Sequence, residues 1–211
     1  LNKLMMDVNF LLEITAKKIA EYLVKCGEIS NNDYEVEYYR YGIEVALSSL
    51  LNLAIIIIIG IISMHIIESL IFLIVFIFVR QVTGGYHADT YFKCNLYLCL
   101  SFVLLLISYD FFSNNNNVYL VTAINIVSLL IISIFSPVEN KNKPIAKANR
   151  KGLKIKSIVF SIIISIISII LHCKSIKYGS ILSLILLLIS MLIIVAKLKE
   201  RRERIYEQTK K

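Results

Sequence analysis

A histidine and a cysteine lie seven residues apart in the segment from Arg80 to Cys94, which is the part of the sequence richest in reactive side chains. A cysteine thiolate is a strong nucleophile, and a nearby imidazole can take the thiol proton and later deliver a proton to a leaving amine. Gly84 and Gly85 precede His87, and without a Cβ the backbone there can bend or approach a substrate chain closely. Those are the requirements of cysteine endopeptidase chemistry. The alternative is an interfacial histidine beside a cysteine that only packs between helices.

The spacing of His87 and Cys94 predicts a bend between them. In a straight α-helix, residues seven apart share a face but are separated by about 10.5 Å, too far for imidazole and sulfur to touch. We therefore expect a helix break or re-entrant turn within residues 84–93, or a separation that closes when substrate binds.

Several nearby residues could support such a pair. Gln81 could donate a hydrogen bond to an oxyanion, and Arg80 is either a snorkelling anchor at a span end or a clamp for a substrate carboxylate. The candidates for orienting His87 are Asp89, Asn95, Glu139 and Asn140. The chain's two prolines, Pro137 and Pro144, bracket a basic loop that includes Lys141 and Lys143. We expect this loop to be a stiff hairpin beside the His87 segment, with a simple cytoplasmic cap as the alternative.

The elements that must position these residues are membrane helices. The chain is 57% hydrophobic and only 18% charged, and its mean hydropathy is +0.73, which is too apolar for an ordinary soluble domain. Measured against the roughly 20 apolar residues that a span needs, the sequence predicts an all-α, polytopic bundle with about six spanning helices. The predicted spans are residues 46–63, 66–79, 96–112, 118–136, 156–173 and 180–196. The second covers only about 21 Å, so it is either tilted or re-entrant.

The distribution of lysine and arginine predicts the orientation. With six spans and both termini inside, 21 of the 23 basic residues lie in cytoplasmic segments, and only Lys174 and Lys177 lie outside. The His87 and Cys94 segment is then cytoplasmic. The net charge of +8 follows from this topology and from anionic inner-leaflet lipid, so no nucleic-acid partner is expected. The alternative is that part of the charge receives an acidic partner.

The regions outside the bundle, which we place at residues 43–196, are polar or amphipathic. Residues 1–42 contain apolar side chains at helical spacing that end near Gly27, which predicts an amphipathic helix. This helix lies in the inner membrane interface or, as the alternative, packs against the cytoplasmic ends of the spans. The tyrosines that follow look like an interface anchor. We expect no signal peptide, so that insertion relies on the later spans. Residues 197–211 form a basic cytoplasmic tail.

Neither a disulfide framework nor a metal site is predicted. The cysteines are scattered at positions 26, 94, 99 and 173, without paired spacing. His65 and His172 fall at the outer ends of their spans, so His87 has no second histidine on its side, and a zinc site is not expected. No cofactor is expected.

The sequence resembles the accessory gene regulator B family of bacterial membrane peptidases. The resemblance rests on two segments and extends over essentially the whole chain. The matching residues are Arg80, Gln81, Gly84, Gly85, His87, Ala88 and Cys94, together with Pro137, Val138, Glu139, Asn140, Asn142, Lys143 and Pro144.

The resemblance implies that Cys94 is the nucleophile and His87 the general base and acid, without a third catalytic residue. It implies an endopeptidase that removes the C-terminal tail of a small quorum-sensing propeptide through an acyl-enzyme, from which an internal cysteine forms a thiolactone. The expected partners are a propeptide with an amphipathic leader and an acidic tail, and anionic lipid; a homodimer is left open. The implied location is the bacterial cell membrane.

Two other classes of function remain open at this point. A peptide transporter or export partner should carry ionisable groups inside its spans, whereas Glu68 and Asp110 lie near span ends. A scaffold that only recruits a peptide to the bilayer would tolerate the loss of Cys94.

Overall fold

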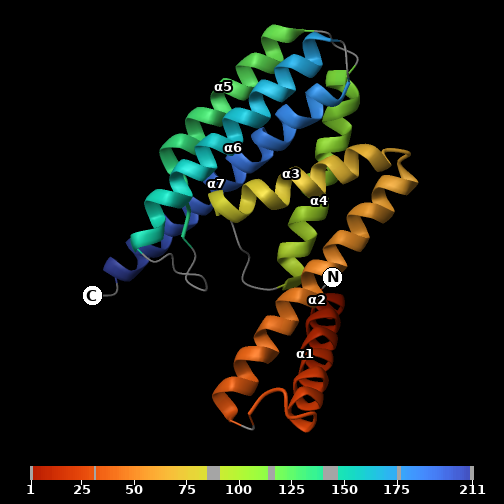
Figure 1. The fold of residues 1–211 in the computed structure, drawn as a ribbon, viewed down its shortest axis with the longest axis vertical. Coiled ribbons are helices and arrows are strands. Elements are labelled where there is room, and N and C mark those ends of the chain that lie inside the picture. The colour runs from red at the N-terminus through yellow and green to blue at the C-terminus, as the bar shows by residue number, and fades with distance from the viewer. Residues whose placement is uncertain are drawn as a thin grey trace. The chain divides into compact units, whose positions relative to one another are not determined.

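The computed structural model describes residues 2–30, 32–84, 91–113, 117–139, 147–174 and 177–209. These residues form seven helices (Figure 1). In chain order they are α1 (Asn2–Lys25), α2 (Asp33–Ile62), α3 (Ile66–Thr83), α4 (Tyr91–Ser113), α5 (Val118–Phe135), α6 (Lys147–Cys173) and α7 (Tyr178–Thr209). The all-α fold class is confirmed: the described residues contain no strand, and their one β-type pairing is an isolated bridge between Gly84 and Val138.

The six helices from α2 to α7 are each long and apolar enough to cross a membrane. Each overlaps one predicted block, and α2, α6 and α7 extend well beyond theirs. The protein is therefore a multi-pass membrane helical protein, as predicted from the apolar runs. The second span is longer than expected, because α3 continues from residue 79 to Thr83 and reaches 18 residues, or about 27 Å.

The chain divides into two compact units, each of which is described by itself. The first contains residues 1–59 and 88–100, and the second contains residues 60–87 and 101–211. Cys94 belongs to the first unit and Gly84 to the second.

In the first unit, α1 ends as the sequence predicted. Gly27 has a φ of 74°, and the N–H groups of Gly27 and Glu28 donate to the carbonyls of Val24 and Leu23, which is how a glycine closes a helix end. The tyrosines at positions 34, 38, 39 and 41 lead into the first span. They lie in the first turns of α2 itself, and their side chains are exposed.

In the second unit, α5, α6 and α7 pack against one another, and α3 packs against α6 and α7 (Figure 1). Large apolar side chains are fully buried here, among them Phe72 and Val79 of α3, Ile132 of α5, and Ile185 and Ile193 of α7. This packing holds α3, and therefore the Gly84 end of α3, in place.

A polar seam runs through the same packed helices. The serines at positions 157, 161, 165 and 168 repeat every three or four residues on α6, so they share one face, and all four are buried. Asn125 of α5 donates to the hydroxyls of Ser168 and Ser183 at 3.3 and 3.1 Å. Small hydroxyl side chains let membrane helices approach closely and hydrogen-bond across the interface.

Candidate functional site

The structure places Cys94 in the first turn of α4, where its side chain is half-buried and its thiol is free. His87, Gly85 and Asp89 lie outside the described residues, as do Asn140, Lys141 and Lys143. The pairing of His87 with Cys94 therefore stays a prediction. What the structure describes is the framework on either side of this segment.

The predicted helix break occurs at Gly84. α3 ends at Thr83, and Gly84 has φ 69° and ψ −157°, a conformation that a residue with a side chain rarely adopts. The Gly84 N–H still donates to the carbonyl of Arg80 at 3.0 Å. The chain therefore turns away from the helix axis immediately before Gly85 and His87.

Gly84 also lies against the loop that follows α5. The N–H of Val138 donates to the carbonyl of Thr83 at 2.9 Å, and a Cβ on Gly84 would collide with the carbonyl oxygen of Val138. Thr83 and Val138 are both buried. The described part of the Pro137 loop thus lies beside the end of α3.

That loop is also fixed to α6. The Ser136 hydroxyl donates to the Ser157 hydroxyl at 2.8 Å, and the Glu139 carboxylate pairs with the Arg150 guanidinium at 3.1 Å. Glu139 is accordingly a tie between the loop and α6. The predicted role of Glu139 in orienting His87 stays a prediction, because His87 lies outside the described residues.

Arg80 and Gln81 belong to the last turn of α3, whereas the predicted second span ended at residue 79. The Arg80 guanidinium lies 5.2 Å from the centre of the Phe76 ring, one turn earlier on the same helix. Gln81 is exposed. The helix can continue through Arg80 because this side chain extends along the apolar face of α3 and keeps its charged group at the end of the span.

On the Cys94 side, a buried hydrogen-bond network fixes the next residue, Asn95. The Asn95 Oδ1 accepts hydrogen bonds from the Ser48 hydroxyl at 3.1 Å and the Asn52 amide at 2.8 Å, both on α2. Both acceptor positions of this oxygen are occupied, so it is poorly suited to accept a further hydrogen bond from an imidazole N–H. The role of Asn95 here is to fix α4 against α2 within the first unit.

Sequence reasoning did not identify Ser48 or Asn52. The available signal was a polar line on α2: Arg40, Glu44, Ser48 and Asn52 recur every four residues and so share a helix face. Arg40 also pairs with Glu44, whose side chain is buried. Polar residues at this spacing within an apolar span indicate a helix contact or a functional site.

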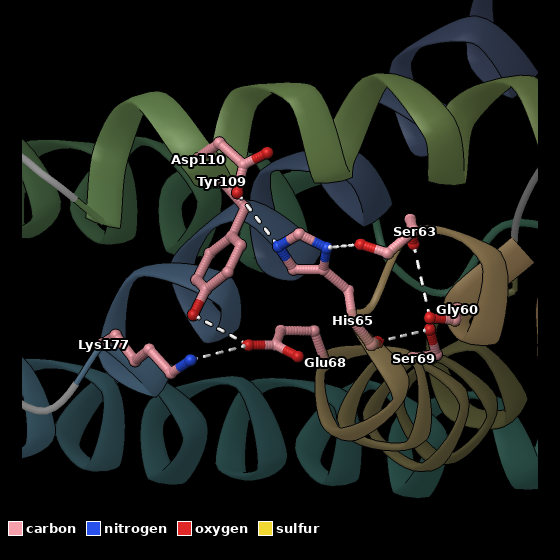
Figure 2. A network of polar contacts seen from close by, with 8 residues as sticks. All are labelled: Gly60, Ser63, His65, Glu68, Ser69, Tyr109, Asp110 and Lys177. Carbon is pink, nitrogen blue, oxygen red and sulfur yellow. Dashed lines mark hydrogen bonds and ion pairs between the residues drawn. The ribbon is translucent and has the colours of Figure 1, made fainter.

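A second polar cluster lies at the other end of α3 (Figure 2). The buried carboxylate of Glu68 accepts a hydrogen bond from the Tyr109 hydroxyl at 3.1 Å and lies 3.5 Å from the Lys177 ammonium. Beside it, His65 Nε2 lies 3.0 Å from an Asp110 oxygen. These contacts join α3, α4 and the segment before α7.

Among the described residues, no group of three or more histidine, cysteine, aspartate or glutamate side chains has the arrangement of a metal site. His65 and His172 are each engaged elsewhere: His65 with Asp110, and His172 with the Ser180 hydroxyl at 3.2 Å.

Comparison with known proteins matches most of the sequence to one family. The sequence profile described as accessory gene regulator B matches residues 16–195. This range includes both His87 and Cys94, as well as the Pro137 loop.

Individual relatives give a consistent result. The chain is 28% identical over 177 residues to a putative AgrB-like protein 2 of Clostridium perfringens, covering 78% of this chain and 80% of the relative. It is 29% identical over 146 residues to the accessory gene regulator protein B of Staphylococcus saprophyticus, covering 67% and 75%. A putative AgrB-like protein of Listeria monocytogenes is 23% identical over 194 residues, covering 92% and 94%. No solved structure matches the chain.

Proposed function

The chain belongs to the accessory gene regulator B family, and from this premise we propose that it is a membrane cysteine endopeptidase. Its substrate is a small quorum-sensing propeptide, from which it removes the C-terminal tail and promotes formation of a thiolactone. The single observation that carries the proposal is the family match across residues 16–195 in a chain that contains His87 and Cys94 at peptidase-like spacing.

The framework around the two residues is compatible with this chemistry. The half-buried thiol of Cys94 lies at the start of an apolar helix, and the chain leaves α3 at a glycine three residues before His87. A thiol near the membrane surface can meet both a membrane-bound leader and a soluble tail.

The reaction follows from the two side chains. His87 takes the proton of the Cys94 thiol, and the sulfur attacks the carbonyl carbon of the scissile peptide bond. As the tetrahedral intermediate collapses, the imidazolium gives its proton to the leaving amine, and the C-terminal tail departs. A thioester between Cys94 and the remaining peptide is left. The thiol of an internal peptide cysteine then attacks this thioester, which forms the thiolactone and restores the Cys94 thiol.

Charge supports the proposed substrate class. The segments assigned to the cytoplasmic side carry nearly all of the basic residues, so an acidic peptide tail and anionic lipid headgroups are both attracted to this face. In this arrangement both termini and the reaction site are cytoplasmic, in a bacterial cell membrane.

The proposal is tested with the full-length protein in membrane vesicles and a propeptide encoded beside its gene. We expect Cys94→Ala and His87→Ala each to abolish release of the tail, while membrane insertion and abundance remain normal. Cys99→Ala is the matched control, because Cys99 is another half-buried cysteine of α4, one that has no assigned role. Cleavage that persists without Cys94 would overturn the endopeptidase assignment and leave peptide export or recruitment as the function.

A further inference from the structure

The turn between α2 and α3, residues 63–65, is organised around His65. The backbone N–H of His65 donates to the carbonyl of Gly60 at 2.8 Å, and its carbonyl accepts from the N–H and the hydroxyl of Ser69 at 3.0 and 2.8 Å. The preceding residue, Met64, has a φ of 59°, a backbone conformation that residues with a side chain rarely adopt. The backbone of this turn therefore holds the start of the His65 side chain in a defined place.

The ring of His65 lies between two hydrogen-bond acceptors (Figure 2). Its Nδ1 is 2.7 Å from the carbonyl oxygen of Ser63, and its Nε2 is 3.0 Å from an oxygen of the Asp110 carboxylate on α4. A carbonyl oxygen and a carboxylate only accept hydrogen bonds, so each ring nitrogen must carry a proton for both contacts to be hydrogen bonds. The ring in this arrangement is therefore an imidazolium.

The charges around His65 agree with this protonation state. Glu68 of α3 and Asp110 of α4 supply two carboxylates, and Lys177, before α7, pairs with Glu68. The His65 ring also lies edge-on to the Tyr109 ring, with the ring centres 5.9 Å apart, and the Tyr109 hydroxyl donates to Glu68. Among the described groups of this cluster, the carboxylates outnumber the other cations by one. An imidazolium at His65 balances that charge.

Loss of one ring proton breaks one of the two contacts, because a ring nitrogen without hydrogen and an acceptor oxygen repel each other. The Ser63 carbonyl belongs to the same short turn as His65 and cannot move away without unwinding it. The Asp110 side chain is 62% exposed, so it can rotate away from the ring. The contact with Asp110 is therefore the one that is released, and Nδ1 is the nitrogen that keeps its proton.

We propose that His65 is a proton-operated latch between the α2–α3 turn and α4, all within the second unit. The latch holds Asp110 while both ring nitrogens are protonated, and it opens when Nε2 loses its proton. Histidine is the side chain that ordinarily changes charge between pH 5 and 8, so the latch closes in acid and opens as the pH rises. In the proposed orientation this turn lies on the outer side of the membrane, where the pH of the medium sets its state.

The first test measures the protons on the ring directly, by nuclear magnetic resonance of the full-length protein in detergent with nitrogen-15 in its histidines. We expect two protonated ring nitrogens on His65 at about pH 5.5, and one, Nδ1, at about pH 8.5. The His65→Phe variant identifies the signals, because the chain contains two other histidines. A single ring proton at the lower pH would overturn the latch, and so would a proton kept on Nε2 at the higher pH.

The second test is a double-mutant cycle of His65→Phe and Asp110→Ala, with unfolding in detergent measured at the same two pH values. His65→Phe keeps an aromatic ring against Tyr109 and loses both nitrogens. Because Asp110 is largely exposed, we expect a coupling of only about threefold in the unfolding equilibrium constant at the lower pH and none at the higher pH.

His172→Phe is the matched control for this cycle. The described contact of the His172 ring is with the Ser180 hydroxyl, so His172→Phe and Asp110→Ala should not be coupled at either pH. Equal coupling of His65 and Asp110 at both pH values would overturn the latch, because the contact would then not need the second ring proton. An absence of coupling at the lower pH would overturn it as well. The resonance measurement on the wild-type protein decides the question if either variant fails to fold.

Discussion

At the scale of single residues, the sequence predicts a reactive pair, but it does not predict the contacts of the residues around that pair. His87 and Cys94 stand out because a possible base and a possible nucleophile lie close together in the sequence. The partners of Asn95 depend on which face of α4 meets α2, and helix rotation is not encoded in any single motif. The pairing of Glu139 with Arg150 was missed for the same reason, since Arg150 reaches Glu139 only once α6 is in place.

The Asn95 network yields a prediction about stability. Asn95→Leu leaves the Ser48 hydroxyl and the Asn52 amide facing an apolar side chain, which should cost about 1–3 kcal/mol of unfolding free energy. Asn52→Leu combined with Asn95→Leu removes both members of the amide pair and should recover at least half of that loss.

Unfolding of the detergent-solubilised variants provides the measurement, analysed as a double-mutant cycle. If the loss in the double variant equals the sum of the losses in the two single variants, the hydrogen bond between Asn52 and Asn95 contributes nothing to stability.

At the scale of elements, the apolar runs predicted which helices exist but not where they end. The second span looked short because Arg80 closes the apolar run, yet α3 continues to Thr83. Hydropathy counts a charged side chain as the end of a span, whereas an arginine can extend along its own helix and leave the backbone helical. Gly84 determines the actual end, through backbone conformation and not through polarity.

The cluster at the opposite end of α3 gives a second stability prediction. Lys177→Met leaves the buried Glu68 carboxylate without its cation. Because Lys177 is 60% exposed and solvent screens part of the attraction, we expect a loss of only about 1–2 kcal/mol. Glu68→Gln together with Lys177→Met should restore most of it, since no buried charge then remains.

Thermal unfolding in detergent measures this effect. Lys174→Met is the matched control, because Lys174 is an exposed lysine nearby for which the described part of the structure records no acidic partner. A loss of equal size in the control would assign the effect to general surface charge and not to the pairing with Glu68.

At the scale of the whole molecule, six spanning helices place both termini on one side of the membrane. In the proposed orientation, which puts the basic segments inside, Cys26 and Cys94 face the cytosol, whereas Cys173 at the end of α6 faces outward. In intact cells, a membrane-impermeant maleimide should label a variant retaining only Cys173 and should not label variants retaining only Cys26 or only Cys94. Cys26 and Cys173 are both exposed, so they form a matched pair. Labelling of Cys26 from outside would reverse the proposed orientation.

The buried hydroxyl face of α6 also bears on how the chain is made. Facing lipid alone, α6 would present four serines and the imidazole of His172 to hydrocarbon, where their hydrogen-bonding groups would lack partners outside the helix. Ser168 meets Asn125 and Ser183, and His172 meets Ser180, only when α5 and α7 are alongside. During biosynthesis, we therefore expect α6 to remain near the translocon until α7 emerges. The last three spans would then enter the bilayer as a group.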